Sequence, residues 1–344
     1  MRARSAVLAA VLLATVSGAA FAQGPGDPTT VFADGFNLPC RLAVDSVGNL
    51  LVTELALGEI WSVAPSGGRT LFTDQVPDPR WLAFDAFGWL LVTSHTDSVV
   101  YRISPQGDLT EFAELAGGVG VATGPDGSIW VGAVDTLFHF DAMGRRLEAI
   151  ETRETFGLAV RALYFAPTGE LYMTGSGTLW KLVAAVPQNL LAGLPLAWAG
   201  IAFDTDGNGY WAHEAYDEGD MDRLSLIDLD GNWLNEAWIT QVVDPCRCAF
   251  GRNPDGSTNS DLYIAQRDGA IVKAAAGSTL AAGWPVVGLR FSDIDEASAA
   301  DEVMGVPNLL TDPTRTFLDV IGNNDGSYDV GDFRAYLIAA GVVE

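Results

Sequence analysis

The chain has 344 residues, 49% of them hydrophobic, so it can bury a large core as one big domain or as a large domain with a small one. Its 44 Asp and Glu residues outnumber the 19 Lys and Arg residues and give a formal net charge of -25, which argues against nucleic acid as a partner. The three cysteines are too few for a disulfide framework.

The amino end has the pattern of a secretory signal. Arg2 and Arg4 precede an apolar run over 6–16, and Ala20-Phe21-Ala22 supplies a small-x-small cleavage site. This run is too short for a membrane span, and no later segment is long and apolar enough. We therefore predict a signal peptide over 1–22, cleavage near Ala22, a leader over 23–30, and secretion to the extracellular or periplasmic space.

A twelve-residue unit recurs along most of the chain. Leu42–Thr53 consists of two short apolar runs joined by a glycine turn, and Leu82–Thr93 repeats it almost letter for letter. Four weaker copies follow, at intervals of roughly 40 residues, the length that a four-stranded blade occupies. The first strands of the six copies are expected at Leu42–Asp45, Leu82–Asp85, Val119–Thr123, Leu163–Ala166, Ile201–Asp204 and Cys248–Gly251.

The fold class that follows is all-β: a six-bladed β-propeller of four-stranded blades over 31–290. The single strands are too short for a βαβ fold, and no helical period lies between them. Closing the ring requires an outer strand for the last blade, because an open edge would invite aggregation. Either Thr30–Asp34 from the amino end or Thr279–Ala282 could supply that strand.

From about residue 38 to 290 the chain resembles the NHL and SMP-30 (gluconolactonase)-like propellers, which share the apolar-Ala-apolar-Asp, Gly, apolar-Val-polar rhythm of Leu42–Thr53. For a gluconolactonase, the resemblance implies a divalent metal at the channel mouth with a glutamate ligand. This chain has Arg or Cys where acidic ligands would be expected, so we expect no cofactor in the propeller.

The loops that lead into the first strands share a face with those that leave the second strands, and a site is expected on that face. Basic and aromatic side chains there could hold a carboxylate, a sulfate or an anionic sugar: Arg41, Arg80, Trp81, Arg161, Arg247 and Arg267. His95 and His213 are the candidate general bases, each acting with Glu54 or Glu214. The alternative is that the arginines pair with Glu54, Glu214 and neighbouring backbone carbonyls and tie the blades together.

The three cysteines leave one disulfide open. Cys40 and Cys246 occupy matching Pro-Cys-Arg positions in the first and sixth copies, which a closed ring makes neighbours. A bridge between them would staple the closure. Cys40–Cys248 is the alternative pairing, and three free thiols are the third possibility.

After residue 290 the repeat stops, and 291–344 is expected to form a linker and a small helical module. The segment 319–333, with an amphipathic stretch behind it, resembles the calcium loop and helix of a dockerin-type module. The resemblance implies calcium ligands at Asp319, Asn323, Asp325, Ser327 (through its carbonyl), Asp329 and Asp332. A plain Asn-Gly turn is the alternative, because Ile321 stands at the first ligand position.

We therefore expect a secreted, monomeric propeller that binds a small anionic or carbohydrate ligand, or a protein, through its arginine-bearing face. A calcium-stabilised carboxyl-terminal module would dock it to a cohesin-like or cell-surface partner. The alternative is an enzyme, a lactonase-like hydrolase or a lyase acting on an anionic or sugar-derived substrate.

Overall fold

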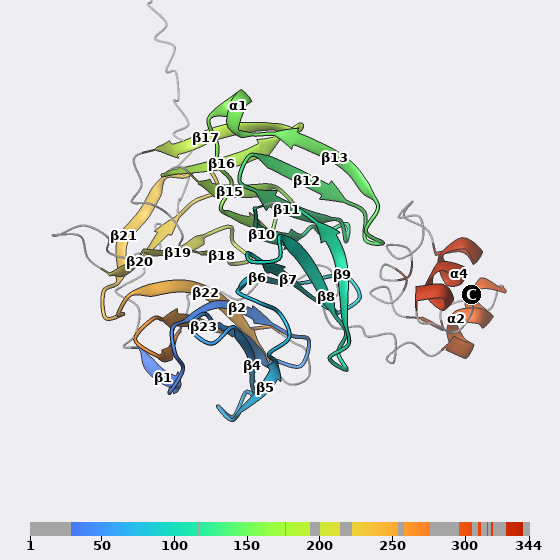
Figure 1. The fold of residues 1–344 in the computed structure, drawn as a ribbon, viewed down its shortest axis with the longest axis horizontal. Coiled ribbons are helices and arrows are strands. Elements are labelled where there is room, and N and C mark those ends of the chain that lie inside the picture. The colour runs from blue at the N-terminus through green and yellow to red at the C-terminus, as the bar shows by residue number, and fades with distance from the viewer. Residues whose placement is uncertain are drawn as a thin grey trace, which may run out of the picture.

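The computed structural model describes residues 29–115, 117–175, 177–192, 200–213, 222–253, 258–275, 296–304, 309–310, 315, 318 and 328–339. Six four-stranded antiparallel sheets lie around a common centre in this part of the chain, as the ring of strands in Figure 1 shows. This arrangement is a six-bladed β-propeller, as the repeat predicts. A short helix, α1 (Arg153–Phe156), lies between the third and fourth blades in the sequence.

Each blade is built from consecutive strands. The first comprises β2 (Pro39–Val44), β3 (Leu50–Glu54), β4 (Glu59–Val63) and β5 (Arg69–Thr73). The second comprises β6 (Pro79–Phe84), β7 (Leu90–Ser94), β8 (Val99–Ile103) and β9 (Leu109–Glu114). The third comprises β10 (Gly118–Thr123), β11 (Ile129–Ala133), β12 (Thr136–Phe140) and β13 (Arg146–Glu151). The fourth comprises β14 (Ala162–Phe165), β15 (Leu171–Gly175), β16 (Thr178–Val183) and β17 (Val186–Ala192). The fifth comprises β18 (Ile201–Phe203), β19 (Gly209–His213), β20 (Arg223–Ile227) and β21 (Trp233–Ile239).

The sixth blade joins the two ends of the repeat array. It comprises β22 (Pro245–Arg252), β23 (Thr258–Gln266), β24 (Ala270–Ala275) and, as its outer strand, β1 (Thr30–Ala33). Thr30 pairs with Lys273 and Val31 with Val272 across the antiparallel junction. The first of the two expected closures is thus confirmed, and the ring is closed by backbone hydrogen bonds between segments that lie far apart in the sequence.

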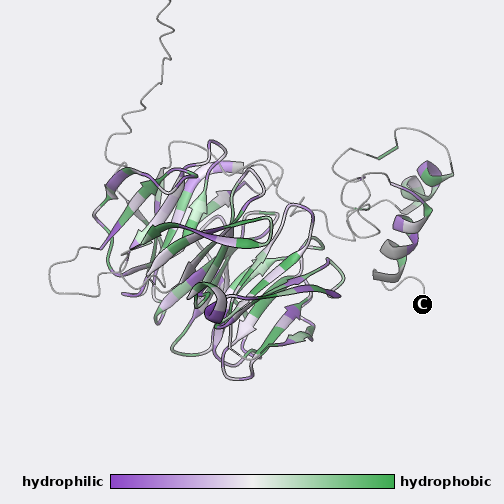
Figure 2. Ribbon diagram, turned by 90° about the horizontal axis from the view of Figure 1, so that it is seen from above, coloured by the Kyte–Doolittle hydropathy of each residue, from purple (hydrophilic) through white to green (hydrophobic). Residues whose placement is uncertain are grey.

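The innermost strands hold the blades together through one repeated apolar position. The residues at this position are almost fully buried: Leu42, Leu82, Val121, Leu163, Ile201 and Cys248. Apolar and polar segments alternate along the strands of the propeller in Figure 2, as expected when each sheet packs against its neighbours. Hydrophobic burial between blades therefore accounts for the apolar residue that all six repeats keep at this position.

The innermost strands of blades 1, 2 and 6 begin three residues earlier than the sequence predicts. Pro39 pairs with Glu54 at the start of β2, and Pro79 and Pro245 occupy the same place in β6 and β22. The register shifts between Pro39 and Leu42, which is typical of a β-bulge. Residues expected on loops, including Arg41 and Arg247, therefore belong to the inner strands, where less water reaches them.

The carboxyl-terminal segment contributes two helices to the described residues, α2 (Glu296–Val303) and α4 (Val330–Ala339). The Tyr328 hydroxyl donates a hydrogen bond to the Ala299 carbonyl (3.1 Å) and connects them. Asp329 and Asp332 form a reciprocal cap on α4: the Asp329 carboxylate accepts from the Gly331 N–H (2.6 Å), and the Asp332 carboxylate accepts from the Asp329 N–H (2.8 Å).

The other four expected calcium ligands, Asp319, Asn323, Asp325 and Ser327, lie outside the described residues, as do the expected signal peptide and Thr279–Ala282. No helix in the described part of the chain is long and apolar enough to cross a membrane.

Candidate functional site

One position of the innermost strand differs sharply between blades. It directly precedes the buried apolar residue and carries Arg41 in blade 1, Trp81 in blade 2 and Arg247 in blade 6. In blades 3, 4 and 5 the residues here are small: Gly120, Ala162 and Gly200. A Cβ on Gly200 would lie 2.7 Å from Cγ of Arg247, so the glycine leaves the room that this side chain occupies. We call Arg41, Trp81 and Arg247 the arginine layer.

The arginine layer is organised around the indole ring. The guanidinium carbons of Arg41 and Arg247 lie 4.3 Å and 4.7 Å from the centroid of Trp81, which is 1% exposed. Arg247 also lies 5.3 Å from the ring of Tyr164, whose ring centroid is 6.0 Å from that of Trp81. Side chains from blades 1, 2, 4 and 6 thus meet, held by cation–π and edge-to-face contacts.

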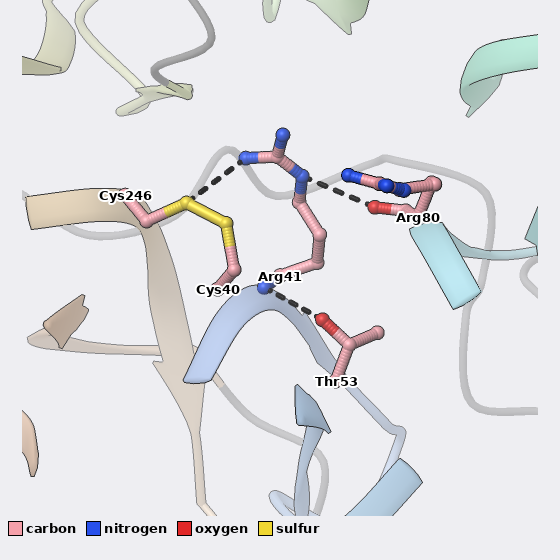
Figure 3. The surroundings of a disulfide bond; sticks show 5 residues. All are labelled: Cys40, Arg41, Thr53, Arg80 and Cys246. Atoms are coloured by element: carbon pink, nitrogen blue, oxygen red, sulfur yellow. Dashed lines mark hydrogen bonds between the residues drawn. A yellow bond between two sulfur atoms is a disulfide. The ribbon is translucent and has the colours of Figure 1, made fainter. Parts of the chain in front are cut away.

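Arg41 is fixed by hydrogen bonds on both sides, as Figure 3 shows. Its Nε donates to the Arg80 carbonyl (3.1 Å), its Nη1 to Sγ of Cys246 (3.3 Å), and its backbone N–H to Oγ1 of Thr53 (3.0 Å). Cys246 is disulfide-bonded to Cys40, and Cys248 is a buried free thiol. The bridge joins the innermost strands of the first and sixth blades beside the arginine layer.

The arginine layer holds more hydrogen-bond donors than the described residues satisfy. Nε and Nη1 of Arg247 and the indole N–H of Trp81 are buried and have no acceptor in the part of the chain that the structure describes. Burial of such donors without partners is costly, so a polar ligand or water is expected to complete them.

The electrostatics of the layer follow from burial and like charge. Burial, together with the charges of Arg247, Arg267 and Arg80, lowers the pKa of Arg41 to about 9. Burial also lowers the pKa of Arg247 and raises that of Tyr164 to about 12. Arg41 and Arg247 thus place two positive charges close together in a region of low polarity, and the charges of Arg80 and Arg267 also act on Arg41.

The remaining predicted basic residues lie nearer the surface. The side chain of Arg80 is 36% exposed and pairs with Asp78 (2.9 Å). Arg161 and Arg267 are half-buried, and their backbone N–H groups donate to the carbonyls of Thr174 (2.8 Å) and Asp244 (3.2 Å).

The predicted acid–base groups are not brought together in the described structure. Glu54 is 3% exposed, and its carboxylate accepts a hydrogen bond from the Asn37 N–H; among the described residues it forms no ion pair with an arginine. His95 is exposed and has no described hydrogen bond to Glu54. Pairing of Glu54 with the arginines is therefore not seen in the described residues, and Glu214 lies outside them. Pairing with a backbone carbonyl is seen for Arg41, whose Nε donates to the Arg80 carbonyl of the neighbouring blade.

His213 has a different environment. It is 4% exposed at the end of β19, and its imidazole stacks on Trp211 with ring centroids 5.3 Å apart. The Trp233 ring lies 5.8 Å away. No three His, Cys, Asp or Glu side chains within the described ranges gather closely enough to hold a metal ion.

A cavity of about 250 Å³ occupies the channel on the other side of the arginine layer, toward the turns that join first and second strands. Its walls are the second halves of the six innermost strands, and Arg247 and Tyr164 also line it. Sequence reasoning missed this cavity and Tyr164. A signal for both was present in the sequence: the repeated apolar-Ala-apolar unit keeps its alanine in five copies and has tyrosine at that position only in the fourth.

No protein-family model matches the chain, and no curated protein matches it in sequence. Several solved structures share its fold. A gluconolactonase from Xanthomonas campestris has a TM-score of 0.56 and 15% identity, over 72% of this chain and 89% of that chain. The calcium-binding protein regucalcin from Agrobacterium tumefaciens has a TM-score of 0.54 and 17% identity, over 74% and 97%. Virginiamycin B lyase from Staphylococcus aureus has a TM-score of 0.53 and 13% identity, over 69% and 94%. The chain thus shares the six-bladed β-propeller fold of these proteins.

Proposed function

We propose that this protein is a ligand-binding propeller that holds a small anionic molecule at the arginine layer. The observation that carries the proposal is the pair of guanidiniums on one buried indole, with two nitrogens of Arg247 lacking an acceptor in the described structure. An anion bound to the Arg247 guanidinium would accept hydrogen bonds from it and offset the charge of Arg41 and Arg247 together.

Physical chemistry favours an anion over a structural role for this cluster. A buried guanidinium is costly unless its charge is paired and its donors are bonded, and the effective cost is several kcal/mol per ion. Burial lowers the pKa of Arg247, the charges of Tyr164 and Cys248 raise it, and no carboxylate of the described residues is among the causes. The planar fork of an arginine matches a carboxylate or sulfate with two parallel hydrogen bonds.

The test is isothermal titration calorimetry of the oxidised, full-length chain with sulfate, acetate, octanoate and gluconate. Arg247→Gln should weaken the binding of any anion that the wild type binds by at least tenfold, the loss expected for a charge-assisted hydrogen bond. Arg145→Gln is the matched control, because it removes the same charge from a side chain that is 78% exposed. Binding that is equal in wild type and Arg247→Gln would overturn the proposal.

An enzyme is the second candidate, and the burial of His213 beside Trp211 and Trp233 favours it. Histidine is the side chain that most often acts as a general base. Both a gluconolactonase and a lyase share the fold. Hydrolysis of a sugar lactone, or loss of a β-leaving group from an anionic substrate, would be measured for wild type, His95→Ala and His213→Ala. Turnover by the wild type that disappears in His213→Ala would support an enzyme with His213 as its base. Equal turnover by the wild type and His213→Ala would rule out His213 as the base, and no turnover by the wild type would count against an enzyme for these substrates.

The cellular setting is proposed from the sequence and from the disulfide. We propose export after cleavage near Ala22, because a Cys40–Cys246 bridge suits an oxidising compartment. We also propose that the dockerin-like segment binds calcium and docks to a cohesin-like or cell-surface partner. Calorimetric titration of the full chain with calcium, compared with Asp325→Ala, tests the metal site: no calcium heat in the wild type would refute it.

A further inference from the structure

We infer that the anion is the head group of an amphipathic monocarboxylate, whose apolar body occupies the channel cavity on the turn side of the arginine layer. This inference rests on the proposed function, since it places the head group on Arg247. It adds the chemical class of the ligand and the side of the molecule from which the ligand enters.

The first ring of the cavity leaves space that an apolar body can fill. It is formed by the residue after the buried apolar position of each inner strand: Ala43, Ala83, Ala122, Tyr164, Ala202 and Ala249. Five methyl groups give this ring of the channel a mostly apolar wall. Tyr164 is the exception, and its ring reaches the arginine layer, 5.3 Å from the Arg247 guanidinium.

The second ring, one residue closer to the turns, is larger and also mostly apolar. It comprises Val44, Phe84, Thr123, Phe165, Phe203 and Phe250. Phe84 and Phe165 are only partly buried, so they present aromatic surface to the cavity. A hydrocarbon chain or a ring that enters here would exchange water for methyl and phenyl groups, which is the main source of affinity for an apolar ligand.

The polar end of the cavity lies at Arg247. This residue lines the cavity while its Nε and Nη1 lack an acceptor within the described residues, so one side chain links the apolar walls to the arginine layer. A carboxylate is the head group that fits, because it can accept two bonds from one guanidinium and continue directly into an apolar body. A sugar acid fits poorly, because its hydroxyls would face alanine and phenylalanine.

The size of the cavity limits the ligand. At about 250 Å³ it exceeds the roughly 150 Å³ cavity that accommodates benzene and lies just below the range of about 300 to 1,000 Å³ typical of ligand pockets. A medium-chain fatty acid or a single-ring aromatic acid is therefore the expected size.

Asp45 and Asp85, at the turns between first and second strands, do not exclude an anion, because each carboxylate is already hydrogen-bonded or ion-paired. Asp45 accepts bonds from the N–H groups of Val47 (3.0 Å) and Asn49 (2.8 Å), and its charge acts on Arg252, which lines the cavity. Asp85 is paired with Arg102 at 2.5 Å.

The test compares acetate, butyrate, octanoate and 1-octanol by titration calorimetry with the oxidised full-length chain. Wild type should bind octanoate, with affinity rising roughly fourfold for each methylene buried, and should bind octanol at least tenfold more weakly. Arg247→Gln should reduce octanoate to the level of octanol and leave octanol unchanged.

Two further variants test the location. Ala83→Leu and Ala249→Leu fill the cavity from different blades and should each weaken octanoate while acetate is unaffected. Ala149→Leu, on an exposed strand position, is the control. A melting curve of each variant shows whether it is folded. The acetate, butyrate and octanoate series with the wild type tests the apolar site even if a variant does not fold.

The titration results distinguish failure of the apolar-body inference from failure of the proposed anion site. If acetate and octanoate bind equally and both depend on Arg247, the apolar body is refuted and the anion site stands. If octanoate and octanol bind equally and ignore Arg247→Gln, both the head group and the proposed function fail. If octanoate does not bind, the inference is overturned.

Discussion

The closure of the ring offers the sharpest test of how this fold is held. Replacing both Cys40 and Cys246 with serine removes the covalent link between the first and sixth blades. The bridge closes a loop of 206 residues, for which the chain-entropy model gives a contribution of about 5 kcal/mol at most. The backbone junction of β1 with β24 closes the same ring and persists in the variant, so the native state should survive with a lower free energy of unfolding.

The assay is urea unfolding followed by tryptophan fluorescence, for the oxidised wild type, the double variant and Cys248→Ser. The double variant should lose about 2 to 5 kcal/mol, the usual range for a native disulfide. Cys248 is the matched control, because it is a buried thiol two residues from the bridge and outside it. If the double variant and Cys248→Ser lose the same free energy, the loss reflects packing of sulfur and the closure argument is refuted.

The remaining predictions concern the charges and the space around the channel. Asp85→Asn should cost about 3 kcal/mol in urea unfolding, because it leaves a mostly buried arginine without its counter-charge, whereas Asp141→Asn, in an exposed pair, should cost less than about 1 kcal/mol. Gly200→Ala should cost about 1 to 3 kcal/mol and weaken octanoate binding, because its Cβ would stand 2.7 Å from Cγ of Arg247; unchanged binding would contradict the packing of the layer. Anion affinity should fall above pH 9, since Arg41, with its pKa near 9, loses the proton that attracts the anion, and flat affinity from pH 7 to 10 would refute this role. Affinity should change little between about 10 mM and 150 mM salt, because a buried pair is screened less than surface charges.

Much of the fold follows from the sequence because its signal is repeated six times. The unit Leu42–Thr53 and its copies predict the number of blades, and the four residues of β1 were recognisable as an outer strand. The starts of the inner strands were predicted too late, because Pro39 and Pro79 are typical loop residues. In the structure they lie at the first position of a strand, where a missing N–H costs no ladder hydrogen bond.

The candidate site was predictable only in part. Arg41 and Arg247 stand out in sequence because they break the apolar pattern, but their position inside the inner strands depended on the bulge between Pro39 and Leu42. The contact with Trp81 depends on how three blades are placed around the channel, and no local pattern contains that information. The predicted pairing of His95 with Glu54 relied on the loops being close, whereas the Glu54 carboxylate accepts from the Asn37 N–H and the exposed His95 has no described hydrogen bond to it.

A ring of similar blades creates a single site only where its symmetry is broken. At the alanine ring, five blades present the same methyl group, and a sixfold channel of this kind has no preferred orientation for a ligand. Tyr164 breaks that ring at one blade, and the adjoining layer places large side chains on three blades and small ones on the other three. Both departures converge on Arg247, which contacts Tyr164 and Trp81 at once. Residues that match the repeat therefore build the propeller, and under the proposed function the residues that depart from it at the channel would give a ligand one place to bind and one way to face.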